Sequence, residues 1–388
     1  MRGHIVKRSK NSYSIVVSMG KDATTGKYKY SWHTVQGTKK DAEKRLSELL
    51  HQLDTGTFMK PSKTTVAEYL ERWLKDYVWP NLSPRGFERY ESIARVHLIP
   101  SLGSITLTQL KAEHLQKHYT AKLNDGFSTL TVRYHHTVIH KALQTAVKWG
   151  LVSRNVADGV DIPRACHKEM QTWDEDDVTR FLEIAKDSPY YALFYTALFT
   201  GMRRSELLAL RWQDVDFVFS QVYVSRSLHH LKDGSYVFTQ PKSATSKRTI
   251  ALPPSAILVL KEHYEKQKLE RVMLGIQLKD DDLVFSHLDK PLRPNTVSRA
   301  WTMLAARYGL KVIRLHDARH THASLMLKQG VHPKIVQERL GHASIQITLD
   351  TYSHVAPGLQ EAAAAQFEKL VSPRYNDTVE NKPVEKHY

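Results

Sequence analysis

The chain has 388 residues, enough for two or three domains that each bury a core of their own. It carries 56 lysines and arginines against 40 aspartates and glutamates, a formal charge of +16. The excess is densest in residues 1–60, which hold 12 basic and 5 acidic residues. Such an asymmetry favours a polyanionic partner, because each phosphate that lysine or arginine neutralises releases condensed counterions.

Cysteine content and hydropathy exclude several classes of protein. The single cysteine, Cys166, excludes an internal disulfide framework and a cysteine-based zinc site. No apolar run approaches ~18 residues, and the N-terminal MRGHIVKRSK lacks the hydrophobic segment of a signal peptide. We therefore expect a soluble, cytoplasmic protein.

The N-terminal 60 residues combine strand and helix patterns. SYSIVVSMG and YKYSWHTV, within residues 12–36, alternate in polarity around a turn that contains Gly26, which predicts a hairpin. The following stretch, TKKDAEKRLSELLHQLDTG, places its leucines on one helical face. A small basic sheet with one helix can place strands in a DNA groove.

The next hundred residues are helical in pattern. After the linker FMKPSKTT, Thr65 and Glu68 form a capping box ahead of a helix that reaches Val78. Three further helices are expected near residues 84–97, 108–122 and 128–149. Their aromatic residues are expected to lie in the core: Trp73, Tyr77, Tyr90 and Tyr119.

A second linker, DGVDIPRACHKEMQ, precedes a mixed segment. Thr172 and Glu175 form another expected capping box. The patterns then predict helices near 175–186, 190–200 and 202–210, strands near 221–229, 235–241 and 248–252, and helices from there onward. The tail, residues 373–388, has little apolar content and is expected to be disordered.

Four stretches of this segment carry candidate chemistry. In LFTGMRRSELLALRW, residues 198–212, Gly201 permits a tight turn at a helix start. Arg203 would point toward the same ligand as the exposed N–H groups there, and helix N-termini attract phosphate. Glu206 and the leucines after it would fix this helix. On its own, the stretch also fits an ordinary amphipathic helix.

The other three stretches add a lysine, two histidines, an arginine and a tyrosine. YVFTQPKSATSKRTIALPP, residues 236–254, is a basic hairpin with Lys242, Lys247 and Arg248 at its tip. RLHDARHTHASLML places His316 and Arg319 three residues apart, on one helical face. LGHASIQITLDTYSHV contributes His342 and, ten residues later, Tyr352.

In this order, Arg203, Lys242, His316 with Arg319, His342 and Tyr352 resemble the catalytic set of the tyrosine recombinases, the phage integrase family. The motifs that carry the resemblance are TGMRRSE, PKSATSKRTI, HDARHTHAS and LGHASIQITLDTY. Lys247 and Lys232 lie near Lys242 and are the alternative lysines.

The resemblance implies a multidomain α+β protein with three DNA-binding parts. These are an arm-type domain over residues 1–60, formed by a three-stranded sheet and a helix, a helical core-binding domain over 61–165, and a mainly helical catalytic domain with a small antiparallel sheet over 166–372. The N-terminal domain is most similar to those in integrases of phages and conjugative elements of Gram-positive bacteria, which implies a bacterial, DNA-associated enzyme.

The implied reaction cuts and rejoins DNA through a 3′-phosphotyrosyl intermediate, without metal, ATP or another cofactor. Tyr352 would be the nucleophile, and Arg203 and Arg319 would hold the phosphate oxygens. His316 would be the general base, Lys242 the general acid, and His342 a hydrogen-bond donor to the phosphate.

The implied partners are double-stranded DNA with core-type and arm-type attachment sites, and further copies of the chain in a tetrameric synapse. A small excision factor and a host DNA-bending protein would assist.

Three other interpretations stay open at this point. His316, His320, His322 and His342 could belong to a metal hydrolase, although no glutamate follows His316 as a general base. A DNA-binding regulator could keep the fold and lack the reaction. A type IB topoisomerase-like enzyme would share the chemistry, but it has no need of an arm-binding domain.

Overall fold

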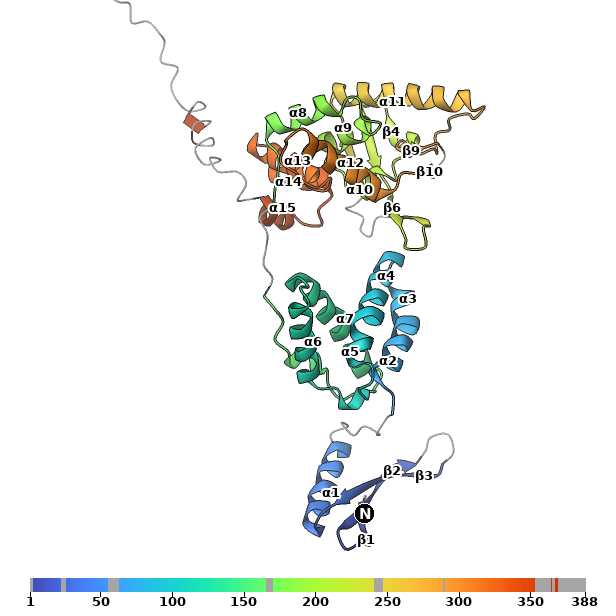
Figure 1. The fold of residues 1–388 in the computed structure, drawn as a ribbon, viewed down its shortest axis with the longest axis vertical. Coiled ribbons are helices and arrows are strands. Elements are labelled where there is room, and N and C mark those ends of the chain that lie inside the picture. Colours follow the sequence, from blue (N-terminus) through green and yellow to red (C-terminus); the bar gives the residue numbers. More distant parts are fainter. Residues whose placement is uncertain are drawn as a thin grey trace, which may run out of the picture. The chain divides into compact units, whose positions relative to one another are not determined.

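The computed structural model describes residues 3–21, 26–54, 63–164, 170–240, 247–288 and 290–352, with 364, 367 and 368; for 52 and 350–352 it describes the backbone alone. The chain divides into two compact units, residues 1–167 and 168–388 (Figure 1). Cys166, Lys242 and the C-terminal tail fall outside the described residues.

The first part of the N-terminal unit is a three-stranded antiparallel sheet with one helix. Strands β1 (Gly3–Ser9), β2 (Ser12–Lys21) and β3 (Tyr28–Gln36) pair in chain order, and α1 (Lys39–Asp54) follows. Ile15, Val17 and Leu49 form the small core between sheet and helix. The expected sheet and helix are confirmed, and β1 adds a strand to the hairpin that the alternating stretches predicted.

The helical part of the same unit begins at the predicted capping box. The Thr65 hydroxyl accepts a hydrogen bond from the Glu68 amide, and the Glu68 carboxylate accepts one from the Thr65 amide. The α-helices are α2 (Val66–Trp73), α3 (Trp79–Asn81), α4 (Pro84–Ile93), α5 (Ile99–Leu102), α6 (Ala112–Asn124) and α7 (Thr129–Lys148). Trp73 and Tyr119 are fully buried, while Tyr77 and Tyr90 stack on Trp73 and are partly buried.

Two of the helices contain one wide π-helical turn each, and prolines explain both. These turns span Leu74–Val78 and Ala94–Leu98, and each ends two residues before a proline, Pro80 or Pro100. A proline ring clashes with the carbonyl four residues earlier and offers no N–H, so the preceding turn widens. The helices continue past the prolines as α3 and α5.

The C-terminal unit is mainly helical. Its helices are α8 (Glu175–Ala185), α9 (Tyr191–Thr200), α10 (Arg204–Leu207), α11 (Pro254–Met273), α12 (Pro294–Arg307), α13 (Asp317–Lys328), α14 (Pro333–Leu340) and α15 (Ile345–Tyr352). Phe181, Phe194, Trp173 and Trp301 pack ring against ring in its core.

Its described strands form three small antiparallel sheets. β4 (Val215–Asp216), β5 (Gln221–Val224) and β8 (Arg248–Ala251) form one, β6 (Ser227–His230) and β7 (Tyr236–Thr239) the second, and β9 (Ser286–His287) and β10 (Lys290–Pro291) the third. The strand expected over 221–229 is therefore two strands in separate sheets. None of the helices in the described part of the chain combines the length and apolar composition needed to cross a membrane.

Two local predictions are wrong. The cap of α8 is Asp174, whose carboxylate accepts a hydrogen bond from the Asp177 amide at 2.8 Å, so Thr172 is not the cap. The helix expected over 202–210 is the single turn α10, and Gly201 ends α9 instead of starting a helix.

Candidate active site

Two helices of the C-terminal unit end at glycines in the left-handed backbone region. α9 ends at Gly201, with φ of 63°, and α14 ends at Gly341, with φ of 67°. A Cβ on Gly201 would lie 2.7 Å from Leu340 Cδ2 and 2.8 Å from His322 Cδ2, so the two helix ends approach each other closely. The last carbonyls of a helix have no partner within it, and these ends therefore offer acceptors to other groups.

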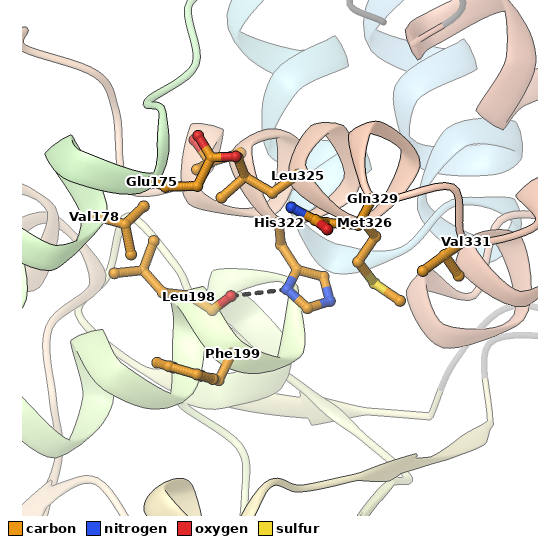
Figure 2. Close-up of a pocket in the computed structure, with 10 residues that line it drawn as sticks. Glu175, Val178, Leu198, Phe199, His322, Leu325, Met326, Gln329 and Val331 are labelled. Atoms are coloured by element: carbon orange, nitrogen blue, oxygen red, sulfur yellow. Dashed lines mark hydrogen bonds between the residues drawn. The ribbon is translucent and has the colours of Figure 1, made fainter. Parts of the chain in front are cut away.

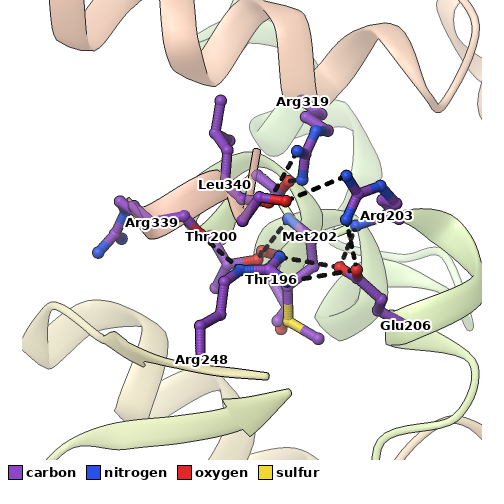
Figure 3. Close-up of polar contacts among 11 residues, drawn as sticks. Thr196, Thr200, Met202, Arg203, Glu206, Arg248, Arg319, Arg339 and Leu340 are labelled. Carbon is purple, nitrogen blue, oxygen red and sulfur yellow. Dashed lines mark hydrogen bonds and ion pairs between the residues drawn. The ribbon is translucent and has the colours of Figure 1, made fainter. Parts of the chain in front are cut away.

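Arg319 binds both of these helix ends. This arginine is only 3% exposed, and its Nη1 donates to Gly201 O at 2.9 Å while Nη2 donates to Leu340 O at 2.7 Å. Figure 3 shows its guanidinium beside that of Arg203. The two carbonyls fix the plane of the Arg319 fork.

Arg203 reaches the same place from the start of α10. Its Nη1 forms an ion pair with Glu206 Oε1 at 2.8 Å, and Nη2 donates to Gly341 O at 3.4 Å. The Arg203 amide also donates to the Glu206 carboxylate. Because the Arg203 side chain stays 35% exposed, it can contact a ligand while Glu206 holds it in position.

Glu206 is buried and also pairs with Arg248, whose Nη2 lies 2.8 Å from Oε2 (Figure 3). Burial alone would raise the pKa of Glu206, but the guanidiniums of Arg248 and Arg203 hold it below its ordinary value. The carboxylate is therefore ionised and orients two arginines at once.

Arg248 corrects the hairpin prediction. It was expected at an exposed tip, whereas the structure places it in β8 with a side chain only 5% exposed. Its Nε donates to Arg339 O at 2.7 Å, and Arg339 in turn donates to Phe199 O at 2.8 Å. Arg203, Arg248, Arg319 and Arg339, here called the arginine cluster, thus bind peptide oxygens near the ends of α9 and α14.

His316 immediately precedes α13, and its ring lies 5.4 Å from that of His320, edge to face. Desolvation, followed by the charges of His320 and Arg319, lowers the pKa of His316 to about 4. Its side chain is nevertheless open to solvent. At neutral pH the ring is therefore uncharged and able to accept a proton.

His342 follows Gly341 and is linked to the last described helix. Its Nδ1 forms a hydrogen bond of 2.8 Å with the hydroxyl of Thr348, which is fully buried in α15. Desolvation, and then the charges of Arg319 and Arg203, lower the pKa of His342 to about 4. His342 also directly follows Gly341, whose carbonyl accepts a hydrogen bond from Arg203.

The remaining two predicted residues are located less completely. Tyr352 is the last residue of α15, four residues after Thr348. Its backbone is described and its side chain is not. Lys242 lies outside the described residues. Lys247 and Lys232 are both described and exposed, so the choice among the three lysines stays a prediction.

The metal-hydrolase interpretation needs histidines that can bind a metal, but both ring nitrogens of His322 form hydrogen bonds within the protein. Its Nδ1–H donates to Leu198 O at 2.8 Å (Figure 2), and its Nε2 accepts from Arg339 Nε at 3.0 Å. Among the described residues, no group of three or more His, Cys, Asp or Glu is arranged to hold a metal ion.

A pocket of about 420 Å³ lies beside His322 (Figure 2). Its lining is mainly apolar and includes Val178, Leu198, Phe199, Leu325, Met326 and Val331. Phosphate binding requires cations or N–H donors, so the candidate active site is the arginine cluster and not this pocket.

Comparison with known proteins identifies the family. The model of the phage integrase family matches residues 171–358, and that of the phage integrase N-terminal SAM-like domain matches residues 65–123. The chain belongs to the phage integrase family of tyrosine recombinases. These enzymes bind DNA, and this recombinase cleaves and rejoins DNA strands.

Relatives of this recombinase match over nearly their whole length. A tyrosine recombinase XerC-like protein of Caldanaerobacter subterraneus subsp. tengcongensis is 28% identical, over 91% of this chain and 94% of its own. The ICEBs1 integrase of Bacillus subtilis is also 28% identical, over 94% of this chain and 100% of its own. The Tn1549 transposon integrase bound to a circular intermediate DNA shares the fold, with a TM-score of 0.67 at 21% identity over 79% of this chain and 99% of that one.

Glu206, Arg248 and Thr348 were not predicted as parts of this recombinase site. Glu206 appeared only as a helix-fixing residue, and Arg248 as a surface cation. The sequence signal was a glutamate three residues after Arg203 within an apolar stretch, since such a carboxylate needs a cationic partner once it is buried. Nothing in the sequence shows that the second partner lies 42 residues away in β8.

Proposed function

We propose that this recombinase integrates, and with an accessory factor excises, a mobile DNA element by way of a 3′-phosphotyrosyl intermediate on Tyr352. The Tyr352 oxygen would attack the phosphorus and form the new P–O bond, and the bond to the 5′-oxygen would break. The phosphotyrosyl bond conserves the energy of the phosphodiester, so ligation runs the same steps in reverse with another 5′-hydroxyl.

The observation that carries the proposal is the fixation of Arg203 and Arg319 on the ends of α9 and α14. Two forks held in this way would bind the non-bridging oxygens and stabilise the charge of the five-coordinate transition state. Because the forks are positioned before the DNA arrives, little reorganisation would accompany the reaction.

Proton transfer requires one acceptor and one donor. His316, neutral at pH 7, would accept the proton of the Tyr352 hydroxyl, whose ordinary pKa is about 10. Lys242 would give a proton to the leaving 5′-oxygen. A Thr348 hydroxyl that donates to His342 Nδ1 would leave the ring proton on Nε2, where it can donate to a phosphate oxygen.

The DNA-binding regions would divide the recognition. Residues 61–165, with the catalytic residues 166–372, would bind core-type sites, and residues 1–60 would bind arm-type sites. Recombination between two duplexes breaks four strands, and one Tyr352 per chain serves one strand, so four copies would assemble in the synapse. A small excision factor and a host DNA-bending protein would set the direction and bring the sites together.

The test is cleavage of a nicked core-site duplex, whose cut fragment diffuses away and traps the covalent adduct. The wild-type protein should form the adduct, and Tyr352→Phe should form none while its affinity for the duplex is nearly unchanged. Tyr375→Phe serves as a matched control outside the motif and should form the adduct. An adduct on the Tyr352→Phe protein would remove this residue from the role.

The same proteins separate the alternatives. A regulator without the reaction would form no adduct even as the wild type. A topoisomerase-like enzyme would relax supercoiled DNA yet would not exchange strands between two attachment-site duplexes.

A further inference from the structure

The outward face of α7 in the helical part of the N-terminal unit is unusual for a solvated helix. None of its twenty residues, Thr129–Lys148, is an aspartate or a glutamate. Leu130 is 55% exposed, and Tyr134, one turn later, is 38% exposed. A helix face with exposed apolar groups and no negative charge suits contact with a polyanion that also has apolar edges.

Arg89 of α4 lies directly over the Tyr134 ring. Its guanidinium carbon is 3.4 Å from the ring centroid, against 4.6 to 5.9 Å for the other cation–ring pairs in the described residues. A guanidinium at this distance stacks on the ring, which restricts its side chain and directs its N–H groups outward in the plane. The pair connects α4 to α7, which pack together.

The neighbouring Arg95 behaves differently. It forms ion pairs with Glu71 at 2.9 Å and Glu91 at 2.6 Å. Arg89 is exposed, and no carboxylate in the described part of the chain pairs with it. An arginine that is oriented by an aromatic ring and left without a counter-ion is prepared to bind a ligand.

We infer that the Arg89–Tyr134 stack reads a guanine in the major groove of the core-type site. Guanine offers the acceptors N7 and O6 to one planar fork, and this pairing is the commonest specific contact of arginine with DNA. Leu130, exposed on the same helix face, fits against a thymine methyl group beside it. The inference rests on the proposed function in one respect, namely that this unit binds the core site.

The experiment selects bound duplexes from a library with a randomised segment, using the full-length protein with Tyr352→Phe so that binding stays noncovalent. Arg89→Lys keeps the charge and loses the planar fork, so the preference for one G·C pair should fall by roughly 5- to 150-fold. Preferences at other positions should persist. Tyr134→Leu should lose the same preference in part, and Tyr134→Phe, which keeps the ring, should retain it.

Arg154→Ala is the matched control. It removes an exposed arginine six residues beyond the C-terminal end of α7, a helix roughly 30 Å long that has Leu130 and Tyr134 near its first residue. This variant should keep every base preference. Equal unfolding temperatures of all variants would show that the fold is intact.

The inference is overturned if Arg89→Lys selects the same bases as its parent, or if it weakens binding to all duplexes equally. Adduct formation is measured separately on proteins with Tyr352. A failure of the proposed cleavage would therefore appear in that assay and leave the base preferences of this one readable.

Discussion

At the scale of single residues, Arg319 and Arg203 differ in burial and in their hydrogen-bond partners. Arg319 is almost fully buried and binds two carbonyls, whereas Arg203 is partly open and pairs with Glu206. Lysine in either position keeps the charge but cannot form the fork, so the single-turnover cleavage rate should fall by about 10²- to 10³-fold in each variant.

Stability should separate the two variants. Arg319→Lys leaves a buried carbonyl without its donor and should lower the free energy of unfolding by about 1–3 kcal/mol. Arg203→Lys should change it less. Chemical denaturation and duplex affinity complete the measurement, and near wild-type cleavage by both variants would make these arginines structural.

The lysine can be identified by changing the leaving group. Lys242→Ala should slow cleavage because the 5′-alkoxide loses its proton donor. A duplex with a 5′-bridging phosphorothioate has a leaving group that needs no proton, so it should restore much of the rate. Lys247→Ala is the control and should cleave the ordinary duplex normally. Rescue of Lys247→Ala in place of Lys242→Ala would show that the wrong lysine was chosen.

The motifs that resemble those of the tyrosine recombinases pointed to Arg203, Arg319, His316 and His342 as candidate side chains. The groups that hold these side chains in position were not predicted. Their partners come from distant segments: Gly341 lies 138 residues from Arg203, and Gly201 lies 118 from Arg319. No periodicity in a single sequence predicts such pairings.

At the scale of elements, α15 carries both Thr348 and Tyr352, so the His342–Thr348 hydrogen bond connects the helix of the proposed nucleophile to the end of α14. Thr348→Val keeps the shape and loses the hydroxyl, and one net hydrogen bond is worth about 0.5–1.5 kcal/mol. Adduct formation should therefore slow by roughly 2- to 13-fold, with duplex affinity unchanged.

A Thr348→Ser variant keeps the hydroxyl and serves as the control. It should restore the rate of adduct formation and the pH profile of the wild type. A Thr348→Val protein that cleaves at full speed would mean that the hydrogen bond does not position His342.

The helix starts predicted from the sequence depend on which side chain caps the first turn. The predicted cap Thr65 is correct although Thr64 precedes it, because only Thr65 has a glutamate, Glu68, three residues later to complete the capping box. At α8 the carboxylate of Asp174, two residues after Thr172, supplied the cap instead. The strand expected over 221–229 is interrupted at Ser225 and Arg226. Arg226 Nε donates to Ala209 O, a tertiary contact that no alternation pattern contains.

At the scale of the whole molecule, the basic N-terminal part should be a separable DNA-binding region. Deleting residues 1–60 removes a net charge of +7, from 12 basic and 5 acidic residues. Every candidate catalytic residue lies beyond residue 200, so the truncated protein should still cleave an isolated core site. It should fail to integrate a substrate that requires arm sites, because it cannot bridge two DNA segments.

Footprinting of both proteins on the attachment region, at several salt concentrations, provides the measurement. Binding to the flanking sites should weaken steeply with salt, since the slope follows the number of neutralised phosphates. Protection of the same flanking sites by the truncated protein would refute the assignment.

The helix ends that hold the arginines also affect how this enzyme can evolve. The two acceptors of Arg319 described above are peptide oxygens, which every amino acid supplies. Exchange of Leu340 for another apolar residue would therefore leave its anchoring atom in place. What must be conserved is the path of the backbone. Conservation is therefore expected at Gly201 and Gly341, whose left-handed conformations other residues adopt only with strain. The surrounding sequence can diverge widely while the guanidinium groups proposed to bind phosphate keep their geometry.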